Sequence, residues 1–130
     1  MASEAVRRRR SLWVIGAVLA GWLVLQQLLH PPTPEPRFCG RDVEPGADTV
    51  VMLSASWCGY CRRARTWLVA EGIEYCEYDV EAHAEGREQF AALPHKVVPV
   101  LKIRGDILVG FNPIEITQTL AAHGITEFDD

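Results

Sequence analysis

The stretch that decides the fold is Trp57-Cys58-Gly59-Tyr60-Cys61, in which two cysteines lie three positions apart. The apolar run 49–53 before it is typical of a short buried strand, and residues 60–70 after it have helical spacing. Cys58 therefore falls at the predicted start of a helix, where free backbone N–H groups and the helix dipole stabilise a negatively charged sulfur. The thiolate is the nucleophilic form of cysteine, which makes Cys58 the candidate nucleophile. Cys61 lies one turn further along the same face and can resolve a mixed disulfide.

A pair of cysteines with this spacing can also be half of a metal site. A zinc site uses about four ligands, commonly a second Cys-x-x-Cys or a pair of closely spaced histidines. The other cysteines, Cys39 and Cys76, stand alone, and the four histidines have no paired spacing. The sequence therefore favours redox chemistry and predicts no metal ligands. A zinc or iron–sulfur module completed by ligands from elsewhere is the alternative.

Basic residues and a proline follow the two cysteines. Positive charge on Arg62, Arg63 and Arg65 would favour a thiolate, although a solvated helix face also accounts for them and is the better explanation for Arg65. Pro99 begins the strand pattern 98–103, and a proline in a strand pattern belongs at its start or at a sheet edge. After a Cys-x-x-Cys helix, this placement indicates a cis peptide bond behind the sulfur atoms.

These motifs resemble the thioredoxin superfamily, and most closely its glutaredoxin branch, over residues 48–123. The matching features follow in order along the chain: the first strand, Cys58-Gly59-Tyr60-Cys61, Tyr78-Asp79-Val80-Glu81, Val98-Pro99, and Gly110 before the last helix. The resemblance implies that Cys58 attacks, that Cys61 resolves and that Pro99 is cis. It also implies that Tyr60, Val98 and Gly110 contact glutathione or a peptide.

The chain departs from the glutaredoxin pattern where that family holds glutathione. Ala55 stands in place of a common lysine, Val97 in place of a threonine, and Val109 in place of the first of two glycines. We therefore expect glutathione to be a poor co-substrate, and no other cofactor is implied. The Trp-Cys start is similar to thioredoxins, and the Gly-Tyr dipeptide is similar to periplasmic disulfide isomerases. Because this dipeptide tunes the reduction potential, the direction of electron flow stays open.

The remaining pattern completes an α/β fold of the thioredoxin/glutaredoxin type, a central four-stranded mixed sheet flanked by helices. Gly72 is the predicted C′ residue that ends the first helix. The other predicted elements are a strand over 73–80, a helix over 82–93, a hairpin of 98–103 and 107–111 across Arg104-Gly105-Asp106, and a last helix over 114–123. We expect the first two strands to pair in parallel and the last two in antiparallel orientation.

The N-terminal segment predicts a membrane anchor. The block Arg7-Arg8-Arg9-Arg10 precedes residues 12–29, which carry no formal charge and would form a helix about 27 Å long, close to a bilayer core. A cleaved signal peptide is the alternative, but residues 26–31 lack the small residues of a cleavage site. Because positive charge stays cytoplasmic, we expect a single-pass protein of the inner membrane with its N-terminus inside. The catalytic domain would then face the periplasm or an equivalent exterior.

The predicted organisation has three parts. Residues 1–30 are the basic N-terminus and anchor, residues 31–47 a proline-rich linker and lead-in, and residues 48–130 the redox domain. Residues 38–130 carry eight basic and fifteen acidic side chains, a net charge of −7. An acidic domain without a basic stripe argues against nucleic acid as a partner.

Cys39 and Cys76 are open to two interpretations. An exported protein with an even number of cysteines permits a second, structural disulfide. Alternatively, Cys76 is a buried free thiol in its strand, since cysteine is among the most buried residue types. The sequence slightly favours the free thiol.

The sequence as a whole predicts a membrane-anchored thiol–disulfide oxidoreductase that acts on protein disulfides. The alternatives are a glutathione-dependent glutaredoxin and a non-catalytic module that binds a metal, an iron–sulfur cluster or a partner through the two cysteines. The sequence does not identify the electron donor.

Overall fold

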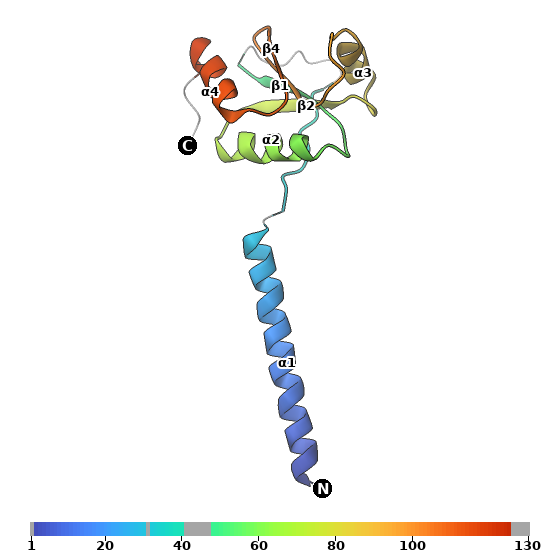
Figure 1. Cartoon of the computed structure of the whole chain (residues 1–130), viewed down its shortest axis with the longest axis vertical. Helices are drawn as coiled ribbons and strands as arrows, with labels where there is room; N and C mark the ends of the chain where they lie inside the picture. Colours follow the sequence, from blue (N-terminus) through green and yellow to red (C-terminus); the bar gives the residue numbers. More distant parts are fainter. Residues whose placement is uncertain (1, 31, 41–47, 126–130) are drawn as a thin grey trace. The chain divides into compact units, whose positions relative to one another are not determined.

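The computed structural model describes residues 2–30, 32–40 and 48–125, and the chain divides into two compact units, Met1–Pro32 and Thr33–Asp130. The first unit contains the single helix α1 (Ala2–Leu29) (Figure 1). Within it, Arg10–Leu29 has a mean hydropathy of 1.9 and no part of that stretch is buried. By length and composition this helix can cross a membrane.

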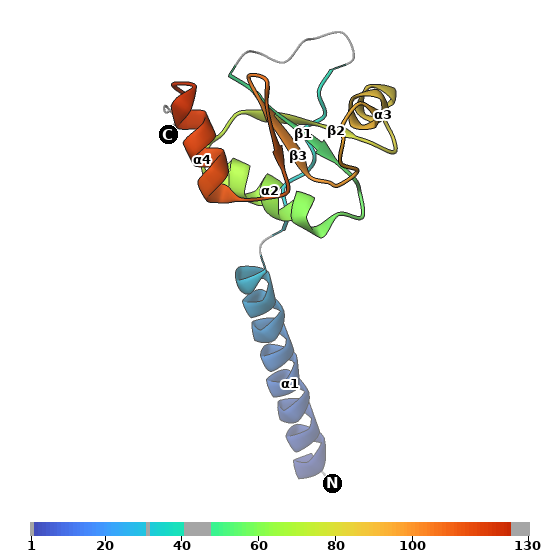
Figure 2. The same cartoon turned by 45° about the horizontal axis from the view of Figure 1, so that its top comes forward.

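The second unit is a four-stranded sheet with helices on both faces (Figures 1 and 2). Its strands are β1 (Val50–Ser54), β2 (Tyr75–Asp79), β3 (Val100–Ile103) and β4 (Asp106–Val109). Its helices are α2 (Gly59–Ala70), α3 (Ala84–Ala91) and α4 (Pro113–Ala122). The strand order is β2-β1-β3-β4; β1 and β2 pair in parallel, whereas β3 is antiparallel to both of its neighbours. The predicted fold class and strand orientations are confirmed, although α3 and β2 are shorter than predicted.

Two apolar clusters lie on opposite faces of the sheet. On one face, Met52 of β1 and Leu101 of β3 pack with Leu68 of α2 and Leu120 of α4. The other cluster contains Leu53 and Val100 of the same strands with Tyr78, Phe90 and both cysteines of the redox pair. Successive strand residues point to opposite faces, so the central strand β1 is buried on both sides. The apolar core on the second face of the sheet therefore includes both cysteines.

Glycines fix two of the chain reversals. Gly72, with φ of +66°, follows α2, and its N–H donates to Val69 O while the N–H of Ile73 donates to Leu68 O. This pair of bonds is the Schellman motif, and it confirms Gly72 as the C′ residue. In the β3–β4 hairpin only Arg104 and Gly105 form the turn, both with positive φ.

The prediction that Asp106 belongs to the β3–β4 turn is wrong. Asp106 is the first residue of β4 and pairs with Ile103. A two-residue turn with positive φ at both positions matches the right-handed twist of the strands, so the ladder extends to Asp106.

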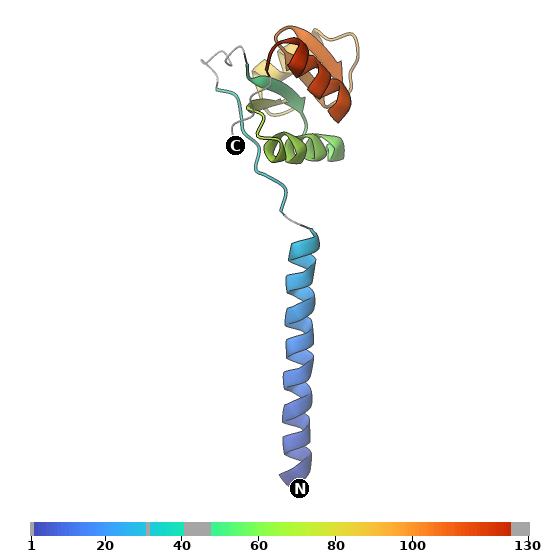
Figure 3. The same cartoon turned by 90° about the vertical axis from the view of Figure 1, so that its left-hand side faces the viewer.

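The lead-in to the domain covers the outer edge of β2 (Figure 3). The N–H of Glu77 donates to Arg37 O at 2.7 Å, and the N–H of Cys39 donates to Glu77 O at 3.0 Å. A parallel bridge pairs Phe38 with Glu77. A disulfide joins Cys39 to Cys76, with Cα atoms 5.0 Å apart. Of the two interpretations open for Cys39 and Cys76, the structure shows the disulfide, because the lead-in pairs with β2 and brings the two cysteines together.

Removing this disulfide should destabilise the domain without touching the redox pair. For the variant Cys39→Ser/Cys76→Ser we expect the free energy of unfolding to fall by about 2–4 kcal/mol, because the unfolded chain loses a cross-link over 37 residues. Denaturant unfolding of the full chain in detergent measures the change. A loss below about 0.5 kcal/mol would show that hydrogen bonding alone holds the lead-in on β2.

Candidate redox site

Cys58 is the N-cap residue of α2, as the sequence predicts. Its backbone is extended, with φ of −78° and ψ of 109°, and its Sγ accepts a hydrogen bond from the N–H of Cys61 at 3.1 Å. An N-cap side chain normally satisfies one of the unpaired donors of the first helical turn. The same donor and the helix dipole stabilise a thiolate at Cys58 when the pair is reduced.

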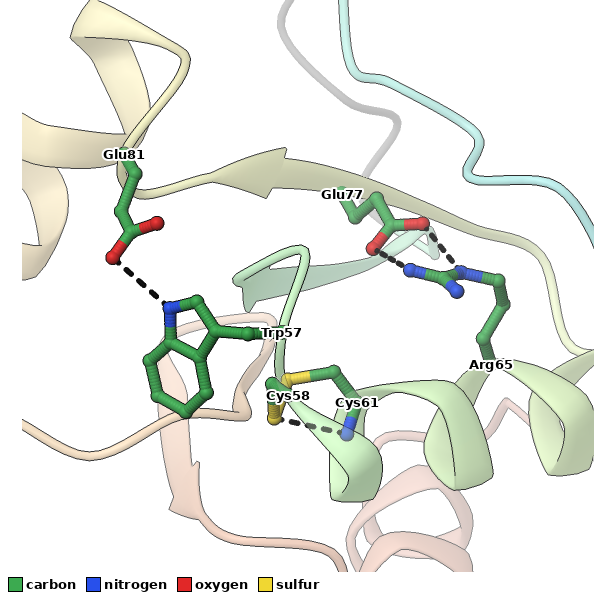
Figure 4. Close-up of a disulfide and its surroundings, with 6 residues drawn as sticks. All are labelled: Trp57, Cys58, Cys61, Arg65, Glu77 and Glu81. Carbon is green, nitrogen blue, oxygen red and sulfur yellow. Dashed lines mark hydrogen bonds and ion pairs between the residues drawn. A yellow bond between two sulfur atoms is a disulfide. The ribbon is translucent and has the colours of Figure 1, made fainter.

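The two cysteines are joined as a disulfide, with Cα atoms 5.2 Å apart (Figure 4). Cys58 is 4% exposed, whereas Cys61 is completely buried. Of the two residues, only Cys58 therefore retains any exposed surface. This difference favours Cys58 as the attacking residue and Cys61 as the resolving one.

The bond between Val98 and Pro99 is cis, which confirms the prediction for this peptide. Pro99 is buried, and its neighbours Val98 and Val100 pack in the same cluster as Cys58. The carbonyl oxygen of Pro99 accepts a hydrogen bond of 2.8 Å from the N–H of Gly110. Gly110 has φ of +89°, a conformation that favours glycine. The proline loop, which shares a cluster with the cysteines, is thus hydrogen-bonded to the turn after β4.

Trp57 stands next to the redox pair and is fixed by an acidic residue. Its Nε1 donates a 3.0 Å hydrogen bond to Oε1 of Glu81 (Figure 4). The backbone oxygen of Glu81 accepts a hydrogen bond from Nη1 of Arg87. The indole is otherwise largely exposed. In the sequence, Glu81 stands out only as part of the fold motif, and no local pattern links it to a residue 24 positions away.

Beneath the redox helix lies a buried ion pair that corrects the interpretation of Arg65. Arg65 does not lie on a solvated helix face: its Nε and Nη2 donate to the two carboxylate oxygens of Glu77 at 2.8 and 2.9 Å (Figure 4). The Glu77 side chain is completely buried. The hydrogen bond with Glu77 raises the pKa of Arg65. The pair ties α2 to β2, one turn beyond Cys61.

One signal could have predicted this pair. Glu77 lies two positions after Tyr75 in β2, so it points to the same face, and Tyr75 is a buried core residue. A glutamate in a strand on the face that α2 covers needs a cationic partner, because an unpaired buried charge is very costly.

Of the other predicted contact residues, Tyr60 adjoins Cys61 in sequence, Val98 shares a cluster with both cysteines, and Gly110 is hydrogen-bonded to Pro99. Tyr60 is exposed, with the guanidinium of Arg63 5.4 Å from its ring centroid, whereas Val98 and Gly110 are half-buried. Within the described ranges, no group of three or more histidine, cysteine or acidic side chains is arranged to hold a metal ion.

Comparisons with known proteins support the glutaredoxin resemblance. The glutaredoxin family model matches residues 50–108. An uncharacterized glutaredoxin-like protein of 8.6 kDa, from the rubredoxin operon of Clostridium pasteurianum, is 29% identical over 72 residues, which are 55% of this chain and 96% of that protein. A glutaredoxin predicted in Mycobacterium tuberculosis H37Rv is 34% identical over 55 residues, which are 41% of this chain and 66% of that protein.

A solved structure supports the fold independently. The crystal structure of a mutant thioredoxin-like protein superposes with a TM-score of 0.52 and 22% identity, over 55% of this chain and 94% of that one. At this identity the likeness concerns the fold alone. Together with the family match, it identifies the second unit of this chain as a glutaredoxin-like domain with the thioredoxin-like fold and a Cys58–Cys61 pair.

Proposed function

We propose that this protein is a membrane-anchored thiol–disulfide oxidoreductase that exchanges electrons with protein disulfides through Cys58 and Cys61. The observation that carries the proposal is the position of Cys58, whose Sγ caps α2 and is bonded to the buried Cys61. In this arrangement Cys58 supplies an activated sulfur for attack, and the sulfur of Cys61 lies close enough to release the product.

In the reducing direction, the Cys58 thiolate attacks one sulfur of a substrate disulfide. The Cys58–substrate bond forms while the substrate S–S bond breaks, and the other substrate sulfur leaves as a thiolate that takes up a proton. Cys61 then loses its proton and attacks Cys58 Sγ. The Cys58–Cys61 disulfide forms, the second substrate thiol is released, and two electrons have passed to the substrate. An external dithiol must reduce the pair before the next cycle, and the reverse sequence oxidises a substrate.

The test of this proposal is a single-turnover reaction. The reduced full-length protein in detergent is mixed with a peptide that contains one disulfide, and both species are followed by mass spectrometry. We expect one peptide disulfide to be reduced for each Cys58–Cys61 disulfide formed. A protein that keeps both thiols while the peptide stays oxidised would favour the non-catalytic binding module instead.

Glutathione should be a poor donor for the oxidised pair. Ala55 is buried, and Val97 and Val109 present only apolar surface, so none of the three offers glutathione a charge or a hydroxyl. We expect little turnover in the glutathione-coupled mixed-disulfide assay but ready reduction by a dithiol. Val97→Thr, at an exposed position, should raise glutathione turnover a few-fold. Efficient turnover of the unmodified protein with glutathione would restore the ordinary glutaredoxin assignment.

We further propose that the domain faces the exterior of an inner membrane, with α1 as its anchor. Support comes from the apolar stretch Arg10–Leu29 behind a block of arginines, and from the Cys39–Cys76 disulfide, because structural disulfides persist in oxidising compartments. Fusions after Asp130 test the topology: alkaline phosphatase, which is active only after export, should be active, and a reporter that works only in the cytoplasm should be silent. The opposite pattern would place the domain in a reducing compartment.

A further inference from the structure

A groove with an apolar floor and two arginines runs along α2 from the redox site. Its volume is about 790 Å³, and it is lined by one face of α2, by residues at the start of α4 and by Thr33 of the lead-in. Tyr60, Trp67 and Phe111 form its apolar surface, and the rings of Trp67 and Phe111 lie 6.0 Å apart. Gly59, the residue after Cys58, is part of the lining, so the groove begins beside the nucleophile.

The charge of this groove is opposite to that of the domain. Arg62 and Arg63 both line it, and neither forms an ion pair with any residue that the structure describes. Residues 38–130 carry a net charge of −7, yet none of the lining residues is acidic. The guanidinium of Arg62 extends back toward the redox site, since a methyl group on Gly59 would lie 3.7 Å from its Nη2.

The groove fits an extended polypeptide better than a small molecule. It extends from Gly59 to Ala70 along α2, a distance of about 16 Å at 1.5 Å per helical residue. An extended chain covers that distance with about five residues. A substrate whose cysteine lies at Cys58 would therefore place the next few side chains over the aromatic rings and the two arginines.

We propose that this groove selects protein disulfides whose cysteine is flanked, within about five residues, by an apolar side chain and a carboxylate. This inference rests on the proposed function and names its substrate class. The apolar side chain packs on Tyr60, Trp67 and Phe111, and the carboxylate pairs with Arg62 or Arg63. Because the domain has a net negative charge, the two arginines also orient the substrate.

The test compares three disulfide peptides that differ at one position, three residues from the reacting cysteine, where they carry Glu, Gln or Lys. The protein is the full chain in a neutral detergent, and the readout is the ratio of kcat/KM values. At low salt we expect the Glu peptide to exceed the Gln peptide by about 1.4- to 5-fold, which is the factor that one exposed ion pair contributes. The Lys peptide should be the slowest, and the ratios should shrink as salt is raised.

Variants separate docking from a general effect on the thiolate. In Arg62→Gln/Arg63→Gln the Glu-to-Gln ratio should fall to near one, whereas Arg62→Lys/Arg63→Lys, which keeps the charges, should retain most of it. Arg37→Gln removes an exposed charge outside the groove and should leave the ratio unchanged.

Three results would overturn the inference. The first is equal kcat/KM values for the Glu, Gln and Lys peptides. The second is a Glu-to-Gln ratio of kcat/KM values that is unchanged in Arg62→Gln/Arg63→Gln. The third is that this same variant slows all three peptides by one common factor and so leaves the ratio as it is in the wild type. Each of them leaves the proposed function standing, because the peptides are still reduced. A wild-type protein that reduces none of the peptides would overturn the proposed function and this inference with it.

Discussion

Cys58→Ser is expected to abolish disulfide exchange, with a loss on the order of a thousandfold or more, because a serine hydroxyl at the start of α2 cannot replace a thiolate as nucleophile. Cys61 is completely buried and cannot substitute for it. The measurement is the rate of peptide disulfide reduction by the full chain in detergent with a dithiol as electron donor.

The control for this loss is the variant Cys39→Ser/Cys76→Ser, which removes the other disulfide. Its turnover should stay within about twofold of wild type under conditions where it is folded, since the redox pair is intact. If Cys58→Ser kept more than about a tenth of the activity, another sulfur would have to be the nucleophile.

Glu77→Ala is expected to lower the free energy of unfolding by about 3–5 kcal/mol, because it leaves the guanidinium of Arg65 buried without its partner. Arg65→Met/Glu77→Leu replaces both charges with apolar groups of similar size. We expect the double variant to recover most of the loss, because removing both charges removes their desolvation penalty. Denaturant unfolding of the two variants, each as the full chain, provides the comparison.

An exposed contact between two polar side chains serves as the matched control for this prediction. His123 Nε2 lies 2.8 Å from Oδ2 of Asp106, and the Asp106 side chain is mostly exposed. Asp106→Asn should cost less than about 1 kcal/mol. A Glu77→Ala variant no less stable than Asp106→Asn would contradict the account of a buried, structurally important pair.

The features that the sequence predicts correctly are governed by local chemistry. The start of α2 at the cysteines and its end at Gly72 each follow from residues close together in the chain, whereas the cis bond at Pro99 follows from the resemblance to thioredoxin-like proteins. The mixed sheet can be predicted as well, because a strand, a helix and a strand that are connected by short loops allow few sheet topologies. Cys58 and Cys61, the central residues of the candidate site, can likewise be identified from a short stretch of sequence.

The features that the sequence does not predict are contacts between distant segments. Arg65 meets Glu77 only because α2 covers the face of β2 on which that glutamate lies. Cys39 meets Cys76 only because the lead-in pairs with the edge of β2. Periodicity indicates which face of an element is buried, but it does not identify the residues packed against that face. For both contacts the sequence gives only an indication: it permits the Cys39–Cys76 bridge, and the alternation of β2 places Glu77 on the buried face without identifying its partner.

Trapping the mixed disulfide with Cys61→Ser tests the central claim most directly. This variant keeps the attacking sulfur but cannot release the product, so it should accumulate a covalent adduct when it is mixed with a disulfide peptide. Peptide mapping by mass spectrometry should find about one peptide per protein, attached through Cys58, while Cys39 and Cys76 stay joined to each other. An adduct on Cys39 or Cys76, or no adduct at all, would contradict the assignment of Cys58 as the nucleophile.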